Sequence, residues 1–186
     1  MRQITLLLTL LFSLVCGGIH AQKTDKSMKV LVAYYSYSGN TRTVAQQIQH
    51  ATNGDIFEIE VVTPYPSDYQ GLLDQAKKEI NNNEKPALKA MPENLAQYDV
   101  ILVGSPNWWS TIAPPVATFL ANANLTGKTV GIFVTHGGGG MARCETDAKK
   151  LYPQARTLKG LAVNGSSAKD ATSRVEKWLK DIGIVE

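Results

Sequence analysis

The sequence has few of the residues that build a disulfide framework or a metal site. Its 186 residues include two cysteines and three histidines, and the histidines stand far apart. A disulfide-rich scaffold and a metal-ligand cluster are therefore excluded. A strong charge of one sign is also missing: the formal net charge is +3, and no basic run indicates a nucleic-acid partner. With 44% hydrophobic and 19% charged residues, the composition is typical of one globular domain with its own core.

The chain also lacks an apolar run of the roughly 20 residues that a membrane-spanning helix needs. Its main apolar run, residues 4–15, follows the positive charge of Arg2 and leads to the small residue Ala21. This arrangement is typical of a secretory signal. We therefore expect a signal peptide at 1–21, a polar tether at 22–28, and a periplasmic or secreted protein without stable membrane insertion. A buried N-terminal helix is the alternative.

Cleavage after Ala21 would remove Arg2 and Cys16. The net charge would fall from +3 to +2, and Cys144 would be the only cysteine left. A single cysteine forms no internal disulfide, even in an oxidising compartment. No His and Asp accompany Cys144 at a recognisable spacing, so a packing role is favoured over a nucleophilic one.

Short apolar runs rich in β-branched residues alternate with helical patterns. Strands are predicted at 28–35, 55–62, 99–103, 128–135 and 155–163, and helices at 41–51, 69–80, 116–123, 141–151 and 169–182. This alternation predicts an α/β domain at 29–186: a three-layer α/β/α fold around a doubly wound, five-stranded parallel sheet. Ligands of such sheets bind at the carboxyl ends of the strands. The loops after the first, third and fourth strands are therefore the candidate site.

The first of these loops runs from a strand into a helix N-terminus. Unpaired backbone N–H groups and the helix dipole favour a phosphate there, and a glycine lets the backbone approach closely. No lysine follows the glycine, so the loop is not a Walker A motif. The alternative is a simple helix cap made by Ser or Thr. The candidate phosphate-binding residues are Ser36, Tyr37, Ser38, Gly39, Asn40 and Thr41.

The loop after the third strand, residues 104–111, contains two adjacent tryptophans. Adjacent side chains in an irregular loop rarely point the same way, so one indole is expected to face a flat aromatic ligand. The alternative is that both indoles cover the sheet edge. The candidate ligand-binding residues here are Ser105, Pro106, Asn107, Trp108, Trp109 and Thr111.

The loop after the fourth strand contains four consecutive glycines, 137–140. Their backbone N–H groups suit close approach to the edge of a flat ligand. With Ala142 the run matches a dinucleotide fingerprint, but no acidic residue ends the following strand, where the ribose partner would stand. His136 is either a site residue or only a polar loop residue. The candidates are Thr135, His136, Gly137, Gly138 and Gly139.

These loops resemble those of the flavodoxin-like family over residues 29–185. The family's phosphate motif, Thr/Ser-x-Thr/Ser-Gly-x-Thr, is matched by Ser36, Ser38, Gly39 and Thr41. The tryptophan and glycine loops are similar to the two loops that contact the flavin ring. The resemblance implies the strand order 2-1-3-4-5, and the short connection after the fifth strand is similar to the short-chain form.

The resemblance also implies FMN as cofactor and electron transfer as function, with Trp108 or Trp109 stacked on the ring. The partner would be a redox protein or a small electron acceptor. The alternative function is an FMN-dependent NAD(P)H:quinone-type oxidoreductase, or one using a similar small acceptor. Two features depart from the family. The chain is slightly basic rather than acidic, which implies a less negative hydroquinone potential. Glycines and His136 stand where the family often has a stacking tyrosine, which implies an open flavin face.

Overall fold

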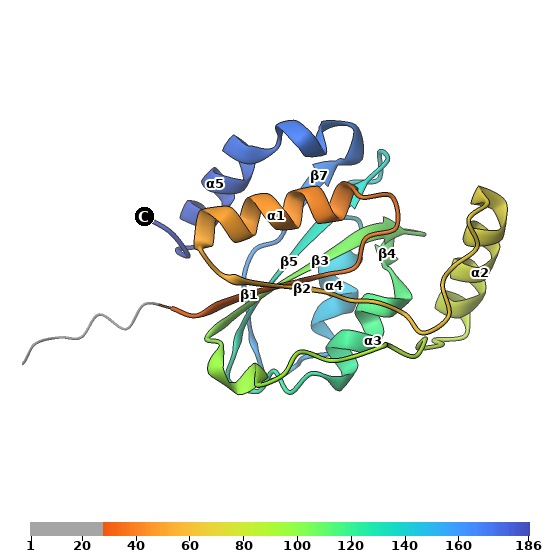
Figure 1. Ribbon diagram of the computed structural model, residues 1–186, viewed down its shortest axis with the longest axis horizontal. Helices are drawn as coiled ribbons and strands as arrows, with labels where there is room; N and C mark the ends of the chain where they lie inside the picture. The colour runs from red at the N-terminus through yellow and green to blue at the C-terminus, as the bar shows by residue number, and fades with distance from the viewer. Residues whose placement is uncertain (1–27) are drawn as a thin grey trace, which may run out of the picture.

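The computed structural model describes residues 28–186 (Figure 1). The predicted signal peptide, and all of the tether except its last residue, lie outside the described residues. No helix within residues 28–186 is long and apolar enough to cross a membrane.

A parallel sheet forms the centre of the domain. Side by side lie β2 (Asp55–Glu58), β1 (Val30–Tyr34), β3 (Val100–Trp108), β5 (Thr129–His136) and, on the outer side of β5, the short strands β6 (Arg156–Thr157) and β7 (Leu161–Asn164). Counting β6 and β7 as one interrupted strand, the predicted order 2-1-3-4-5 and the doubly wound α/β fold are confirmed.

Helices cover both faces of this sheet (Figure 1). On one face, α1 (Asn40–Thr52) and α5 (Thr172–Asp181) bury Val44, Ile48 and Leu179 against β1, β3 and β5. On the other face lie α3 (Pro114–Asn122) and α4 (Cys144–Lys149).

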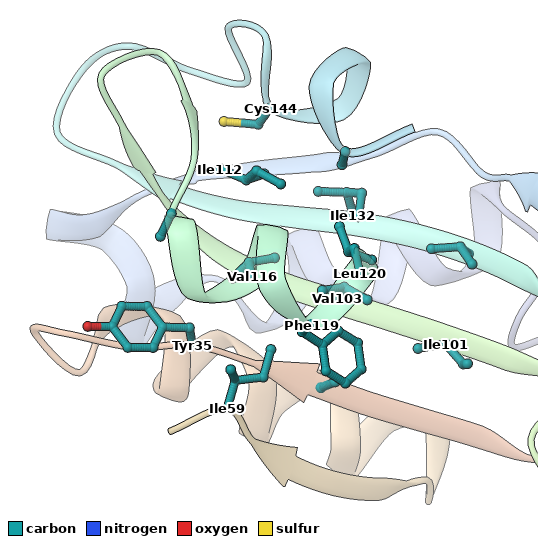
Figure 2. Packing of buried hydrophobic residues seen from close by; sticks show 14 of the residues in the cluster. Tyr35, Ile59, Ile101, Val103, Ile112, Val116, Phe119, Leu120, Ile132 and Cys144 are labelled. Carbon is teal, nitrogen blue, oxygen red and sulfur yellow. The ribbon is translucent and has the colours of Figure 1, made fainter. Parts of the chain in front are cut away.

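The second face is densely packed. Figure 2 shows Val116, Phe119 and Leu120 of α3 against Val103 of β3. Cys144 is fully buried beside this layer, and burial raises the pKa of its thiol to about 12. A thiol that stays protonated at neutral pH is a poor nucleophile, so the predicted packing role fits.

Helix α2 (Tyr69–Asn81) lies beyond the end of the sheet rather than on a face (Figure 1). Asp68 caps it by accepting a hydrogen bond from the backbone N–H of Gly71 at 2.7 Å. Leu72 and Ala76 are buried, as their helical spacing predicts. The helix therefore lies near the end of the sheet at which β3 ends.

The predicted loop 104–111 is wrong in part. Strand β3 continues to Trp108, and a two-residue turn joins it to the antiparallel strand β4 (Thr111–Ile112). Strand β3 includes Pro106, and it tolerates this proline for a topological reason. β1 pairs with β3 only as far as Gly104, so beyond that point one edge of β3 has no partner and a missing N–H costs no ladder bond.

Other predicted boundaries are corrected as well, and the helix predicted at 141–151 is shorter, Cys144–Lys149. β2 ends at Glu58, and the chain beyond it forms only an isolated bridge between Val61 and Leu88. The fifth strand is interrupted at 158–160, where the Gly160 N–H donates to Glu145 Oε2 at 2.7 Å instead of continuing the ladder. Two 3₁₀ helices, η1 (Leu95–Gln97) and η2 (Gly165–Asp170), were not predicted, and η2 delays the start of α5 to Thr172.

Candidate cofactor site

A pocket of about 860 Å³ lies at the carboxyl ends of the central strands. The three predicted loops meet there. From the first come Tyr37, Ser38 and Asn40, from the second Pro106, Asn107, Trp108 and Trp109, and from the third Thr135, His136 and Gly137.

Two segments of the pocket wall were not predicted from the sequence. The inner face of α2 contributes Tyr69, Leu72, Leu73 and Ala76, and the junction of β7 with η2 contributes Asn164, Gly165 and Ser166. The α2 residues have the helical spacing of an ordinary core face, and this spacing does not distinguish a core face from a pocket wall. The junction could have been found, because it follows the fifth strand at its carboxyl end.

The first loop divides its hydroxyl groups between two tasks. Ser36 Oγ accepts the backbone N–H of Arg42 at 3.2 Å, which is the capping role of the alternative interpretation. Gly39 is the N-cap residue of α1, with φ 90° and no side chain to cap the helix. Ser38 and Asn40 line the pocket. The helix N-terminus is thus capped in part by Ser36 and otherwise turned toward the pocket.

Thr41 lies behind the pocket rather than in its wall. It is 2% exposed, and its Oγ1 lies 2.8 Å from Oγ1 of Thr135, which is 5% exposed. This buried hydrogen bond joins the first loop to the third.

Ser105 and Thr111 support the second loop through hydrogen bonds within the protein. Ser105 Oγ accepts the Ala113 N–H at 2.9 Å and donates to the Pro106 carbonyl at 2.8 Å. Thr111 Oγ1 donates to Asp147 of α4 at 2.9 Å. Neither of these predicted ligand-binding residues lines the pocket.

The two adjacent indoles point to different neighbours. Trp108 lies in a cluster of edge-to-face rings, and the centroid of its ring is 5.6 Å from that of Tyr35, 6.1 Å from that of Tyr37 and 5.1 Å from that of Tyr65. Burial raises the pKa of both Tyr35 and Tyr65. These phenols therefore stay neutral; Trp108 and Tyr37 line the pocket, and the buried Tyr35 and Tyr65 support Trp108 from the protein side.

Trp109 turns instead toward α2. Its Nε1–H donates to the carbonyl of Leu73 at 3.2 Å, and Lys77 Nζ lies 4.9 Å from the centroid of its ring. The side chain is 44% exposed at the pocket edge. The prediction that the two indoles do not share one direction is confirmed.

The glycine loop is held at both ends and open in the middle. His136 Nδ1 accepts the Gly138 N–H at 3.1 Å, and Asn107 Nδ2 donates to the Gly140 carbonyl at 2.8 Å. Gly138 has φ 147°, a conformation that favours glycine. The predicted ligand-binding residues Gly138 and Gly139 do not line the pocket. A Cβ added to Gly139 would stand 3.3 Å from Asn107 Nδ2, whereas one added to Gly137 would meet no atom within 4 Å.

The lining contains no Asp, Glu, Lys or Arg side chain among the described residues. Backbone N–H groups, hydroxyls and amides supply its polar surface, while Trp108 and the inner face of α2 supply its apolar surface. Pockets of this mixed type bind small organic ligands, and 860 Å³ lies within their usual range of about 300–1,000 Å³.

The comparisons with known proteins agree with this fold. The flavodoxin family model matches residues 29–182. A crystal structure described as a flavoprotein, from Bacteroides eggerthii, is 32% identical, with a TM-score of 0.75 over 83% of this chain and 98% of that one. One from Bacteroides uniformis is 31% identical, with a TM-score of 0.74 over 83% and 99%.

A flavoprotein from Lactobacillus acidophilus, solved in complex with FMN, is 25% identical, with a TM-score of 0.66 over 81% of this chain and 98% of that one. The family model and the two Bacteroides structures each cover most of the domain that carries the pocket. The chain belongs to the flavodoxin family.

Proposed function

We propose that this chain binds FMN in the pocket at the strand ends and serves as a flavodoxin-like electron carrier. The observation that carries the proposal is the meeting of three loops around one pocket: a helix N-terminus, an aromatic wall and a glycine loop. When bound, FMN supplies the redox chemistry, and the protein contributes binding, orientation and electrostatics.

The phosphate end of FMN fits the N-terminus of α1. Gly39 leaves the first turn without a side-chain cap of its own, and Ser38 and Asn40 border the pocket beside it. An anion there gains from the backbone N–H groups and from the helix dipole, without a lysine or arginine. Gly165 fits the same arrangement, because a Cβ at that position would stand 2.6 Å from Asn40 Nδ2 and displace that side chain.

The ring end of FMN fits the part of the pocket that Gly137 and Trp108 line. Gly137 has neither a positive φ nor a neighbouring atom that would exclude a side chain. Protein packing therefore gives no reason for a glycine there, whereas close approach of a ligand does. Trp108 lines the same pocket and offers it an aromatic ring, which Tyr35 packs against edge-to-face from the protein side. The FMN complex of the Lactobacillus acidophilus flavoprotein supports FMN as the ligand.

An FMN-dependent oxidoreductase is the second candidate, reduced by NADH or NADPH and oxidised by a quinone or a similar small acceptor. The apolar wall from α2 favours it, because Leu72, Leu73 and Ala76 line the pocket in addition to the three loops. A small acceptor that enters the pocket would find an apolar surface there.

Export is a further part of the proposal. The arrangement of residues 4–21 supports a signal peptide, and a protein translocated unfolded would acquire FMN outside the cytoplasm. The mass of the protein recovered from the natural host tests this. A chain beginning at Gln22 is expected, and a mature chain that retains Met1 would refute the cleavage.

Two measurements on the reconstituted protein test the redox function. Anaerobic reduction is expected to give a flavin that passes its electrons stoichiometrically to an added one-electron acceptor. Steady-state assays with NADH or NADPH and benzoquinone then distinguish the candidates. Slow turnover supports a carrier, and rapid turnover without a partner protein supports the oxidoreductase. A bound flavin that cannot be reduced and reoxidised would refute both.

A further inference from the structure

The turn between β3 and β4 has a conformation that its residues disfavour. Trp109 and Ser110 are its two central residues, with φ values of 52° and 67°. Positive φ at both positions is the requirement of a type I′ turn, which usually selects Asn-Gly. A tryptophan and a serine pay a steric penalty there. Contacts of the turn with its surroundings must compensate for that penalty.

Those contacts lie on two sides. On one side, the Ser110 carbonyl accepts the backbone N–H of Arg143, just before α4, at 3.0 Å. On the other, the Trp109 indole lies against α2, where it donates to the Leu73 carbonyl at 3.2 Å and has Lys77 Nζ 4.9 Å from its ring centroid. Because Leu73 and Lys77 are one helical turn apart, the indole contacts the middle of α2.

Helix α2 depends on such contacts for its place. It stands beyond the sheet, between irregular segments at 59–68 and 82–94, rather than on a sheet face (Figure 1). The segment before it is held by two of the predicted site loops. The Tyr37 hydroxyl donates to the Pro66 carbonyl at 2.7 Å. Tyr65 packs on Trp108 and donates its hydroxyl to the buried carboxylate of Glu79 on α2.

We propose that Trp109 is a positioning residue, whose indole holds α2 against the pocket so that α2 retains the ligand. The inference rests on the proposed function in one respect, namely that the ligand is FMN. It assigns Trp109 to α2 rather than to stacking on the flavin, because its N–H is bound to Leu73 and Lys77 lies over its ring. This contact with α2 explains why a tryptophan occupies an exposed, strained position at the pocket edge.

The substitution Trp109→Phe separates the two roles. A phenylalanine keeps a flat ring for stacking but removes the N–H that binds α2. In the FMN-free protein, we expect backbone hydrogen exchange of α2 to become about 3- to 10-fold faster, as for the loss of one hydrogen bond. Exchange in α5, on the far face of the sheet, is expected to stay unchanged. In the FMN-loaded protein, release of FMN on dilution is expected to accelerate by a similar factor.

Ser110→Gly is the matched control. It relaxes the same turn and leaves the indole in place, so α2 exchange and FMN release are expected to match those of the unsubstituted protein. If Ser110→Gly accelerates both as Trp109→Phe does, the turn rather than the indole positions α2, and the proposal is wrong.

The FMN-free measurement keeps the two proposals apart. Unchanged α2 exchange in Trp109→Phe overturns the positioning role. Faster α2 exchange with unchanged FMN release overturns the role of α2 in retention. An unsubstituted protein that does not bind FMN overturns the proposed function and the retention role together, while α2 exchange still decides whether Trp109 holds the helix.

Discussion

The hydrogen bond between Thr41 and Thr135 offers a quantitative test of how the phosphate loop and the glycine loop are joined. The two hydroxyls lie 2.8 Å apart and the two residues are 2% and 5% exposed, so water is a poor replacement for a lost partner. Thr41→Val or Thr135→Val keeps the side-chain shape and leaves the other hydroxyl buried and unpaired. Each single substitution is expected to lower the free energy of unfolding by about 1–3 kcal/mol.

The double substitution gives the sharper result. When both hydroxyls are replaced by methyl groups of the same shape, neither is left unpaired, and the loss is expected to be smaller than the sum of the two single losses. The coupling should be about 1 kcal/mol or more, as for residues in direct contact. Each kcal/mol corresponds to a shift in Tm of about 2–4 °C for a protein of this size.

Urea unfolding of the FMN-free protein, followed by tryptophan fluorescence, measures all four variants of this cycle. Using the FMN-free protein keeps ligand binding from shifting the apparent stability. Single losses that add within about 0.3 kcal/mol would show that the two hydroxyls do not interact. That result would refute the structural link between the two loops.

Three further results are expected. Gly137→Ala should change the free energy of unfolding by no more than about 0.5 kcal/mol, because the added Cβ meets no atom within 4 Å. The same substitution should weaken FMN binding. An unchanged FMN affinity in a fluorescence titration would show that the glycine loop is not part of the site. Gly104→Ala should lower the free energy of unfolding, measured with urea, by about 3 kcal/mol, because the added Cβ would stand 2.2 Å from the Phe133 ring. An unchanged free energy of unfolding would contradict that packing. Burial raises the pKa of Cys144 from 9.0 to about 12, so its contribution to stability is complete below pH 9 and is lost as the pH rises toward 12, at up to about 1.4 kcal/mol per pH unit. Cys144→Ala should therefore flatten the alkaline fall in unfolding free energy, and equal slopes in the two proteins would refute the assignment.

The sequence was sufficient for the fold because its signals are local and periodic. Alternating strand and helix patterns predicted the parallel sheet, and the burial of Val44, Ile48 and Leu179 follows the spacing that marked their helices. The interrupted fifth strand was not predictable in the same way. Its break depends on Glu145, a residue 15 positions away that accepts the Gly160 N–H.

The site was predictable where it obeys the rule that ligands bind at strand ends, and less so where tertiary contacts decide. Ser38, Asn40 and His136 line the pocket as the loop positions suggested. Ser105 and Thr111 do not, because both lie in strands rather than in a loop, and their hydroxyls bond to the Ala113 N–H and to Asp147. No local signal indicates that α2 leaves the sheet face to form a wall of the pocket.

The central claim, that the N-terminus of α1 holds the phosphate of FMN, is tested most directly by comparing FMN with riboflavin. The two ligands share the ring and the ribityl chain and differ only in the phosphate. Titration of the FMN-free protein, followed by quenching of flavin fluorescence, is expected to show one FMN per chain and at least about 100-fold weaker binding of riboflavin, as for the loss of several charge-assisted hydrogen bonds. Equal affinity for the two ligands, or no binding of FMN, would contradict the account.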